Sequence, residues 1–295
     1  MHTPAVPTGP SRSSSRPLPA FSGALVHIER TWLGLHAPPW NVRAHESAWT
    51  PSEPDDFCWR CGRTAGPFEV APPESQTPGC SVCVSQKLPW ERFIRVGEYA
   101  GVLRKAIHET KFHRVHALGA SLGRELGVAI ARELRWEGHD PADCILVPVP
   151  ASWRRRLASG IDHALAIARA AGEVSGCAVR RPIRRRHGPS QLQVPPSQRL
   201  RNAARSFLPA SLWYPAAGRL PPCLRQGRGV VVVVDDVRTT GATMQGACRA
   251  LASALALHLP VRPRIWAAVV AVTPEPGRQN SSANEPRPSD PLDPA

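Results

Sequence analysis

The sequence is poor in lysine and has no long apolar run. Three of its 37 basic residues are lysines (Lys87, Lys105 and Lys111), so arginine provides most of the formal net charge of +14. A positive net charge favours anionic partners such as phosphate esters or nucleic acid, but it does not identify a binding surface. The longest apolar run, residues 265–272, is far too short to cross a bilayer, and residues 1–40 lack the continuous apolar region of a secretory signal. We therefore expect a cytoplasmic protein without a membrane span.

Several catalytic signatures are absent as well. No dinucleotide-binding fingerprint and no P-loop occurs, and the 11 histidines form no recognisable catalytic pair. Gly119, Gly123 and Gly127 recur at a spacing of four residues within a helical pattern, which favours close helix packing over ligand binding. The sequence therefore assigns neither a nucleophile nor a general base.

Composition divides the chain into four segments. Residues 1–56 are rich in Pro, Ser, Ala and Arg, which predicts a disordered N-terminal extension, and residues 274–295 predict a disordered tail. Residues 57–90 contain a cysteine module. Residues 91–273 alternate between strand and helix patterns, and this alternation predicts an α/β fold with a parallel sheet and right-handed crossovers.

Periodicity locates the elements of this last segment. We expect helices at 101–108, 162–174 and 244–257, and a longer helix that contains Leu118 to Leu134 and ends near residue 137. The expected strands are 144–149, 178–183, 230–234 and 265–272. Residues 184–228 form a loop-rich stretch, and a loop of this length counts against the assignment of elements unless it is a functional lid.

Four of the eight cysteines form two close pairs. Cys58-Trp-Arg-Cys61 and Cys80-Ser-Val-Cys83 are separated by 18 residues. Four thiolates at this spacing predict a zinc ribbon, whereas the alternative, a redox-active pair, requires one pair at a helix start. Four sulfur ligands leave no open position on the metal, so a structural role is expected, with metal binding supplying folding free energy. The other four are typical of small buried hydrophobic residues: Cys144, Cys177, Cys223 and Cys248.

The most informative motif of the chain lies in residues 230–243. Five consecutive valines, Val230–Val234, predict a strand that is buried on both faces at the centre of a parallel sheet. Asp235 and Asp236 follow at the strand's expected end, and the segment Thr239-Thr240-Gly241-Ala242-Thr243 leads into a helix. In open α/β sheets, ligands bind outside the carboxyl ends of the strands, which is where this motif falls.

The residue types of this motif suit a sugar phosphate. The helix start offers unpaired N–H groups and a partial positive charge to an anion, and the threonine hydroxyls add donors. Gly241 allows the backbone to approach a phosphate closely. Ionised Asp235 and Asp236 only accept hydrogen bonds, so they require hydroxyl donors or a metal ion. We expect the turn to hold a phosphate and the Asp pair to hold vicinal hydroxyls; an ordinary capped helix start is the alternative.

The same residues resemble the 5-phosphoribosyl-1-pyrophosphate (PRPP) motif of type I phosphoribosyltransferases. In that family the Asp pair meets the ribose 2′ and 3′ hydroxyls, and the turn holds the 5′-phosphate. Together with the cysteine module, the chain resembles the ComF family, which includes the GntX-like proteins, from Cys58 to about Val272. The resemblance also rests on residues 99–112, on Leu146-Val-Pro-Val-Pro150, and on Gln191, Arg199, Asn202 and Phe207 at the spacing Q-x7-R-x2-N-x4-F. It implies a type I phosphoribosyltransferase-like α/β domain with a parallel sheet, preceded by a small four-cysteine zinc ribbon.

The resemblance also implies which residues hold PRPP. It assigns ligand binding to Asp235, Asp236, Thr239, Thr240, Gly241, Ala242, Thr243, Gln191 and Asn202. Phosphoribosyl transfer expels pyrophosphate, which requires cations: Mg²⁺ with PRPP, helped by Lys111 or Arg199, with Arg154, Arg155, Arg156 and Arg186 as further candidates. Two positions depart from the family pattern, because Ser159 replaces a usual arginine and Gly188 a common threonine. Both bear on the handling of pyrophosphate, and hence on catalysis.

Three functions are compatible with these features. The ComF resemblance implies a protein that binds PRPP or a related ribose phosphate and serves DNA uptake in natural transformation, with single-stranded DNA and a helicase-type ATPase as partners. The second is an active phosphoribosyltransferase of nucleotide metabolism with an unknown acceptor. The third is a zinc-ribbon protein that binds nucleic acid through its basic charge, with a steep salt dependence. We expect the first, and the sequence leaves catalysis open.

Overall fold

The computed structural model describes residues 38–66, 68–112, 116–151, 162–185, 206–210, 221–256 and 259–274. All of them belong to one compact unit, residues 37–295. Several predictions lie outside the described residues: those for residues 1–37 and 275–295, and those for Arg154, Arg155, Arg156, Ser159, Arg186, Gly188, Gln191, Arg199 and Asn202.

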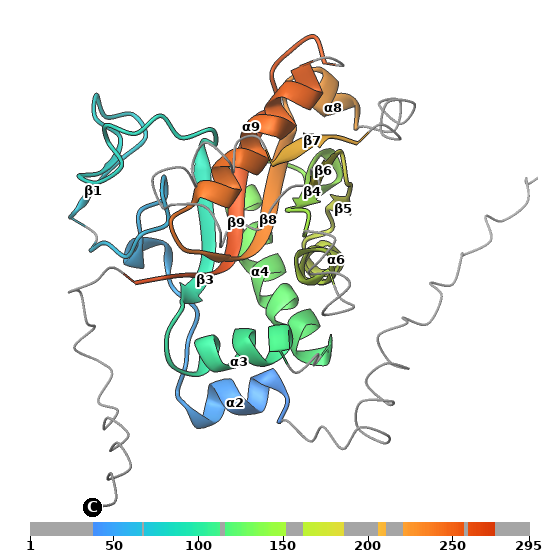
Figure 1. Cartoon of the computed structure of the whole chain (residues 1–295). Helices are drawn as coiled ribbons and strands as arrows, with labels where there is room; N and C mark the ends of the chain where they lie inside the picture. Colours follow the sequence, from blue (N-terminus) through green and yellow to red (C-terminus); the bar gives the residue numbers. More distant parts are fainter. Residues whose placement is uncertain are drawn as a thin grey trace, which may run out of the picture. The chain divides into compact units, whose positions relative to one another are not determined.

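A five-stranded parallel sheet forms the centre of this unit (Figure 1). Its strand order is β3-β9-β8-β4-β5. The strands are β3 (Arg92–Glu98), β4 (Ile145–Pro148), β5 (Ala178–Val179), β8 (Val230–Arg238) and β9 (Arg264–Val272). The predicted α/β class is therefore confirmed, and the valine-rich strand is the central one.

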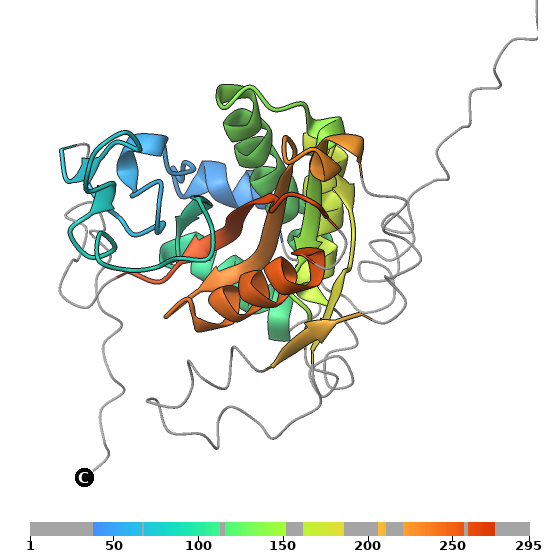
Figure 2. The same cartoon turned by 90° about the horizontal axis from the view of Figure 1, so that it is seen from above.

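Helices cover both faces of the sheet. One face carries α3 (Gly101–Phe112), α4 (His116–Trp136) and α6 (His163–Ser175), and the other carries α9 (Ala242–Ala256), as Figures 1 and 2 show. The valines of β8 alternate between the two cores: Val230, Val232 and Val234 pack on the α4 side, and Val231 and Val233 pack on the α9 side. All five are fully buried, as expected for the central strand of a parallel sheet.

Shorter elements complete the unit. The α9 side of the core also includes Ile183, Phe207 and Leu224 from three of them. These three elements are β6 (Ile183–Arg185), β7 (Phe207–Pro209) and α8 (Pro222–Arg225). Strands β6 and β7 pair antiparallel. The remaining short elements are α2 (Trp40–Glu46), η1 (Pro54–Asp56), the antiparallel pair β1 (Val70–Ala71) and β2 (Gly79–Cys80), and η2 (Pro141–Asp143). Among the helices that the structure describes, none combines the length and apolar character needed to cross a membrane.

Close packing of α4 against α6 explains the helical glycines. A Cβ atom at Gly123 would lie 2.7 Å from the carbonyl oxygen of Ile167, and one at Gly127 would lie 2.7 Å from that of Ala171. Real Cβ atoms do not approach backbone so closely, so the two helices meet along these glycines. The prediction that they serve packing is confirmed for this pair.

The structure differs from the sequence-based predictions in three regions of the chain. Strand β3 was not predicted, because Arg92 and Arg95 interrupt its apolar pattern although Arg95 is 2% exposed. The pair β6–β7 and helix α8 lie partly within the stretch predicted to be loop-rich. Helix α2 lies within the predicted disordered extension, and its Trp40 is buried in the α4-side core next to Trp49. A single large aromatic residue in a proline-rich segment carries no periodicity, which explains this difference.

Candidate functional site

The Asp pair lies at the carboxyl edge of the sheet, as predicted, but β8 does not end before it. The strand continues to Arg238, with Asp235 paired with Val269 and Arg238 paired with Val272 of β9. The neighbouring strand β4 ends close by, since the N–H of Val149 donates to the carbonyl of Val234 over 2.8 Å. Strand β9 is paired with β8 as far as Arg238, so its backbone supplies the hydrogen bonds that continue β8 past the Asp pair. The sequence did not indicate this continuation, because two adjacent charged residues are typical of a strand end.

Local hydrogen bonds orient the two carboxylates. The N–H of Asp236 donates to Asp235 Oδ1 (2.9 Å), and the N–H of Val237 donates to Asp236 Oδ1 (2.6 Å). The second oxygen of Asp236 lies 2.8 Å from Lys111 Nζ, at the C-terminal end of α3. The side chains of Asp236 and Lys111 remain 18% and 30% exposed, respectively. The fold thus brings a predicted cation to the predicted Asp pair from a distant part of the sequence.

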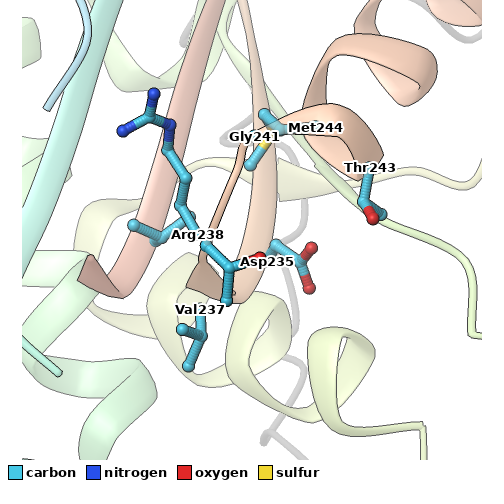
Figure 3. A pocket seen from close by; sticks show the side chains of 8 residues that line it. Asp235, Val237, Arg238, Gly241, Thr243 and Met244 are labelled. Carbon is cyan, nitrogen blue, oxygen red and sulfur yellow. The ribbon is translucent and has the colours of Figure 1, made fainter. Parts of the chain in front are cut away.

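The turn after β8 has the geometry of a helix start. Thr239 and Thr240 are exposed, and Gly241 adopts a φ of +79°, which favours glycine. Helix α9 begins at Ala242, whose N–H points to Thr240 Oγ1 at 3.4 Å. A small cavity of about 20 Å³, room for about one water molecule, opens beside the turn (Figure 3). Its lining consists of Asp235, Val237, Arg238, Thr239, Gly241, Thr243, Met244 and Val269.

Arg238 is the lining residue that sequence reasoning missed. Its side chain is directed away from the Asp235 carboxylate (Figure 3). Its guanidinium lies over the Phe93 ring, with its Cζ 5.4 Å from the ring centroid. Strict alternation would place Val234 and Val237 on opposite faces, yet both pack against the α4-side core. The alternation therefore slips by one residue, and Arg238 turns to the α9 side with Phe93. In the sequence, the one feature that could have pointed to Arg238 is its position as a lone arginine between the Asp pair and the threonines.

The four paired cysteines form one compact cluster. Their Sγ atoms all lie within 4.8 Å of one another, and the pairs Cys58–Cys83, Cys61–Cys80 and Cys80–Cys83 are each 3.7 Å apart. Sulfur atoms of a tetrahedral zinc site with Zn–S bonds of about 2.3 Å are separated by about 3.8 Å. All four cysteines are free and buried, so the cluster is neither a pair of disulfides nor open to substrate. The residues fit a structural zinc ion.

Electrostatics of the cluster also favour a bound cation. Hydrogen bonding with Cys61 and Cys83 lowers the pKa of Cys58 to about 2, whereas contact with Cys58 raises the pKa of Cys61 and raises that of Cys83 to about 11. Four thiols this close therefore cannot all ionise without positive charge among them. A bound Zn²⁺ removes this conflict, because it binds thiolates.

The cysteine module is attached to edge strand β3. The N–H of Phe93 donates to the carbonyl of Trp59 over 2.7 Å, and Arg95 donates to the carbonyl of Gly62 (3.2 Å) and to Thr64 Oγ1 (2.9 Å). Burial lowers the pKa of Arg95 to about 10, against the opposing charges of Glu98 and Asp56. The module thus shares buried polar contacts with the sheet.

Cysteines outside the cluster behave as small hydrophobic residues. Cys144, Cys177 and Cys248 are buried, and burial raises the pKa of each. Cys223 is half-buried. The three buried thiols are therefore mostly protonated at neutral pH and are not nucleophiles.

Comparisons with known proteins give relatives at modest identity. No family model matches the sequence. The chain is 29% identical over 196 residues to "DNA utilization protein YhgH" of Salmonella typhi, which covers 64% of this chain and 74% of the relative. It is 28% identical over 199 residues to the protein of the same name from Escherichia coli (strain K12), covering 64% and 80%. The chain is therefore similar, over more than half of its length, to proteins named for DNA utilization.

Proposed function

We propose that this chain binds PRPP or a related ribose phosphate at the turn between β8 and α9, and that it serves the uptake and utilization of DNA. One observation carries the ligand part of the proposal. Asp235 and Asp236 lie at the carboxyl edge of the sheet between a threonine-lined helix start and the ammonium group of Lys111. This grouping of hydrogen-bond acceptors, hydrogen-bond donors for an anion, and a cation supports the proposal of a site for a phosphorylated sugar.

Each part of the ligand has a matching group. The turn 239–243 presents hydroxyls and the N-terminal N–H groups of α9 to a phosphate. The Asp pair accepts hydrogen bonds from vicinal ribose hydroxyls. The ion pair between Lys111 and Asp236 is part-exposed, and such pairs contribute about 0–1 kcal/mol. A ribose hydroxyl can therefore replace the lysine at Asp236, which leaves the ammonium for a second phosphate group.

The carboxylate oxygens are also the ligand type that Mg²⁺ prefers. When bound with PRPP, Mg²⁺ would neutralise charge on the pyrophosphate oxygens. The chain's own residues would orient the sugar: Asp235 and Asp236 on the diol, and the turn on the 5′-phosphate. Phosphoribosyl transfer is the second candidate function. The Asp pair and the turn would hold the sugar at its hydroxyls and 5′-phosphate, which leaves the C1 carbon open to an acceptor. Lys111 would then be free to contact the departing pyrophosphate.

The DNA part of the proposal rests on the relatives and on charge. Proteins named for DNA utilization align with 64% of this chain at 28–29% identity. The formal charge of +14 suits a polyanionic partner. As the ComF resemblance implies, single-stranded DNA and a helicase-type ATPase are the proposed partners.

Calorimetric titration with ribose 5-phosphate, and with PRPP plus Mg²⁺, tests the ligand site. Asp236→Asn should weaken binding of both ligands by about tenfold, because hydrogen bonds to a charged group contribute about 1.5–3 kcal/mol. Asp55→Asn, an exposed carboxylate in η1, is the matched control and should bind as the unmodified protein does. Normal binding by Asp236→Asn would refute the proposed site.

Three further measurements separate the candidate functions. Release of pyrophosphate from PRPP, assayed with a set of nucleobase and amine acceptors, would support the enzyme. Binding of single-stranded DNA that falls steeply with salt and is unaffected by Asp236→Asn would indicate a nucleic-acid surface apart from the turn. Deletion of the gene should reduce uptake or use of external DNA if the proposed role is correct.

A further inference from the structure

Arg238 is a buried cation whose side chain is directed away from the nearby Asp235 carboxylate (Figure 3). It is 7% exposed, and its Nε atom is buried without a hydrogen-bond partner in the described part of the chain. No carboxylate among the described residues forms an ion pair with it. A buried charge is costly unless other groups compensate for it. Beyond the Phe93 ring, negative charge in its surroundings would stabilise it.

The four-cysteine cluster is a source of that charge. The Phe93 ring, over which the guanidinium lies, packs so closely on Gly62 that a Cβ atom there would collide with it, and Gly62 directly follows Cys61. Burial lowers the pKa of Arg238, and the thiolates of Cys61, Cys83 and Cys58 oppose that shift, while Arg63 adds to it. Four thiolates around one Zn²⁺ retain a net charge of about −2. Because the four thiols cannot all ionise without the metal, loading with Zn²⁺ makes the cluster more negative and strengthens its attraction for the guanidinium.

The same side chain supports the phosphate-binding turn. A Cβ atom at Gly241 would lie 3.0 Å from Arg238 Nε and 3.6 Å from Nη2, so the guanidinium lies directly beside this glycine. Arg238 also lines the cavity together with Asp235, Thr239 and Thr243. Its charge adds to the positive end of α9, which favours an anion at the turn.

We propose that Arg238 is a positioning residue that couples the four-cysteine metal centre to the phosphate-binding turn: its guanidinium packs on Phe93, whose ring contacts the cysteine module at Gly62, and lies beside Gly241 of the turn, so that metal at the cluster and phosphate at the turn each favour the other. The turn half of this inference rests on the proposed ribose-phosphate site, and the cluster half does not. Coupling between two sites is reciprocal, so each ligand should strengthen binding of the other by the same factor.

The test uses the full zinc-loaded chain and three variants. Arg238→Met removes the charge and keeps most of the volume, and Arg238→Lys keeps the charge. Arg249→Met makes the same change on the exposed face of α9 and is the control. The two probes are ribose 5-phosphate, titrated by calorimetry, and a chromogenic chelator that competes for Zn²⁺.

In the unmodified protein, saturating ribose 5-phosphate should tighten zinc retention by about tenfold, a typical coupling. Arg238→Met should bind ribose 5-phosphate and retain zinc about tenfold less tightly, and the ligand should no longer protect the metal. Its melting temperature in excess Zn²⁺, where the cluster stays loaded, should change little, because an apolar replacement of a buried charge is often neutral or stabilising and offsets the weaker metal binding. Arg238→Lys should keep part of the coupling, and Arg249→Met should match the unmodified protein.

The outcomes separate this inference from the proposed function. If the unmodified protein binds no ribose 5-phosphate, the proposed function fails, while zinc retention in Arg238→Met still decides the cluster half. If ribose 5-phosphate binds normally but zinc retention is independent of both the ligand and Arg238, the coupling is refuted. If Arg238→Met does not fold, Arg238→Lys supplies the comparison, and loss of zinc despite its retained charge would overturn the electrostatic role.

Discussion

Two cationic residues near the carboxyl edge of the sheet, Lys111 and Arg238, differ in how readily a bound ligand could displace their present contacts. Lys111 is held by Asp236, and Arg238 lies between an aromatic ring and a glycine turn. The first contact is part-exposed and weak, whereas the second is buried. At the residue scale, we therefore expect the Lys111 side chain to move to a bound ligand and the buried Arg238 side chain to stay in position.

We predict that Lys111→Gln weakens PRPP binding by about tenfold, because a charge-assisted contact to phosphate contributes about 1.5–3 kcal/mol. Its effect on stability should be within about 1 kcal/mol. Lys105→Gln, which changes an exposed lysine of the same helix, serves as the control. Calorimetry and thermal melts measure the two effects. Tighter PRPP binding in Lys111→Gln would instead mean that the lysine only blocks Asp236.

At the scale of elements, the approach of α4 to α6 determines how firmly the sheet is covered. Glycines allow the two helices to touch through their backbones, and the leucines of α4, such as Leu122 and Leu126, then fill the core below. The helix α3 precedes α4 and carries Lys111 at its end. Packing of α4 therefore also fixes where the lysine meets the Asp pair.

Gly127→Ala should destabilise the protein by about 1–3 kcal/mol, because the new methyl group would lie 2.7 Å from the carbonyl oxygen of Ala171. This sign is opposite to the gain of about 1 kcal/mol that the same change gives at an exposed helical position. Val128→Ala, at a position 58% exposed, should be nearly neutral. Urea denaturation compares the variants. A stabilised Gly127→Ala would contradict the close contact.

At the scale of the whole molecule, the cysteine module depends on metal more than on a core of its own. Its buried cluster consists of the four cysteines and Ala65, with Val70 and Leu88 at its edge. This small set buries too little apolar surface to fold the module, so metal binding must supply the free energy. Its attachment to β3 then transmits any loss of metal to the sheet.

Purified protein should contain about one zinc per chain. Cys83→Ser should lose this zinc and lower the melting temperature, whereas Cys223→Ser, outside the cluster, should keep it. Acidification should also release the metal, because protons compete for the thiolates. Elemental analysis and thermal melts follow both effects. A metal-free protein with an intact module would refute the zinc site.

Local patterns in the sequence were sufficient for the class of fold and for the cysteine cluster. Five consecutive valines indicate a buried central strand whatever its neighbours in the sheet are. Two C-x-x-C pairs indicate one metal site, because the cysteines of each pair are close in sequence and can bind the same ion. The helical glycines likewise indicated close packing before any partner was known. These signals work because hydrophobic periodicity and ligand spacing act over a few residues.

Only the tertiary structure decided which distant residues meet. It brought Lys111 to Asp236 and extended β8 past the Asp pair along β9. It also buried Arg95 against the cysteine module and Arg238 against Phe93. A slip in strand alternation, which depends on the neighbouring strand, chose the face on which Arg238 lies. Such contacts depend on the register and docking of elements far apart in the chain, and no local pattern of residues encodes them.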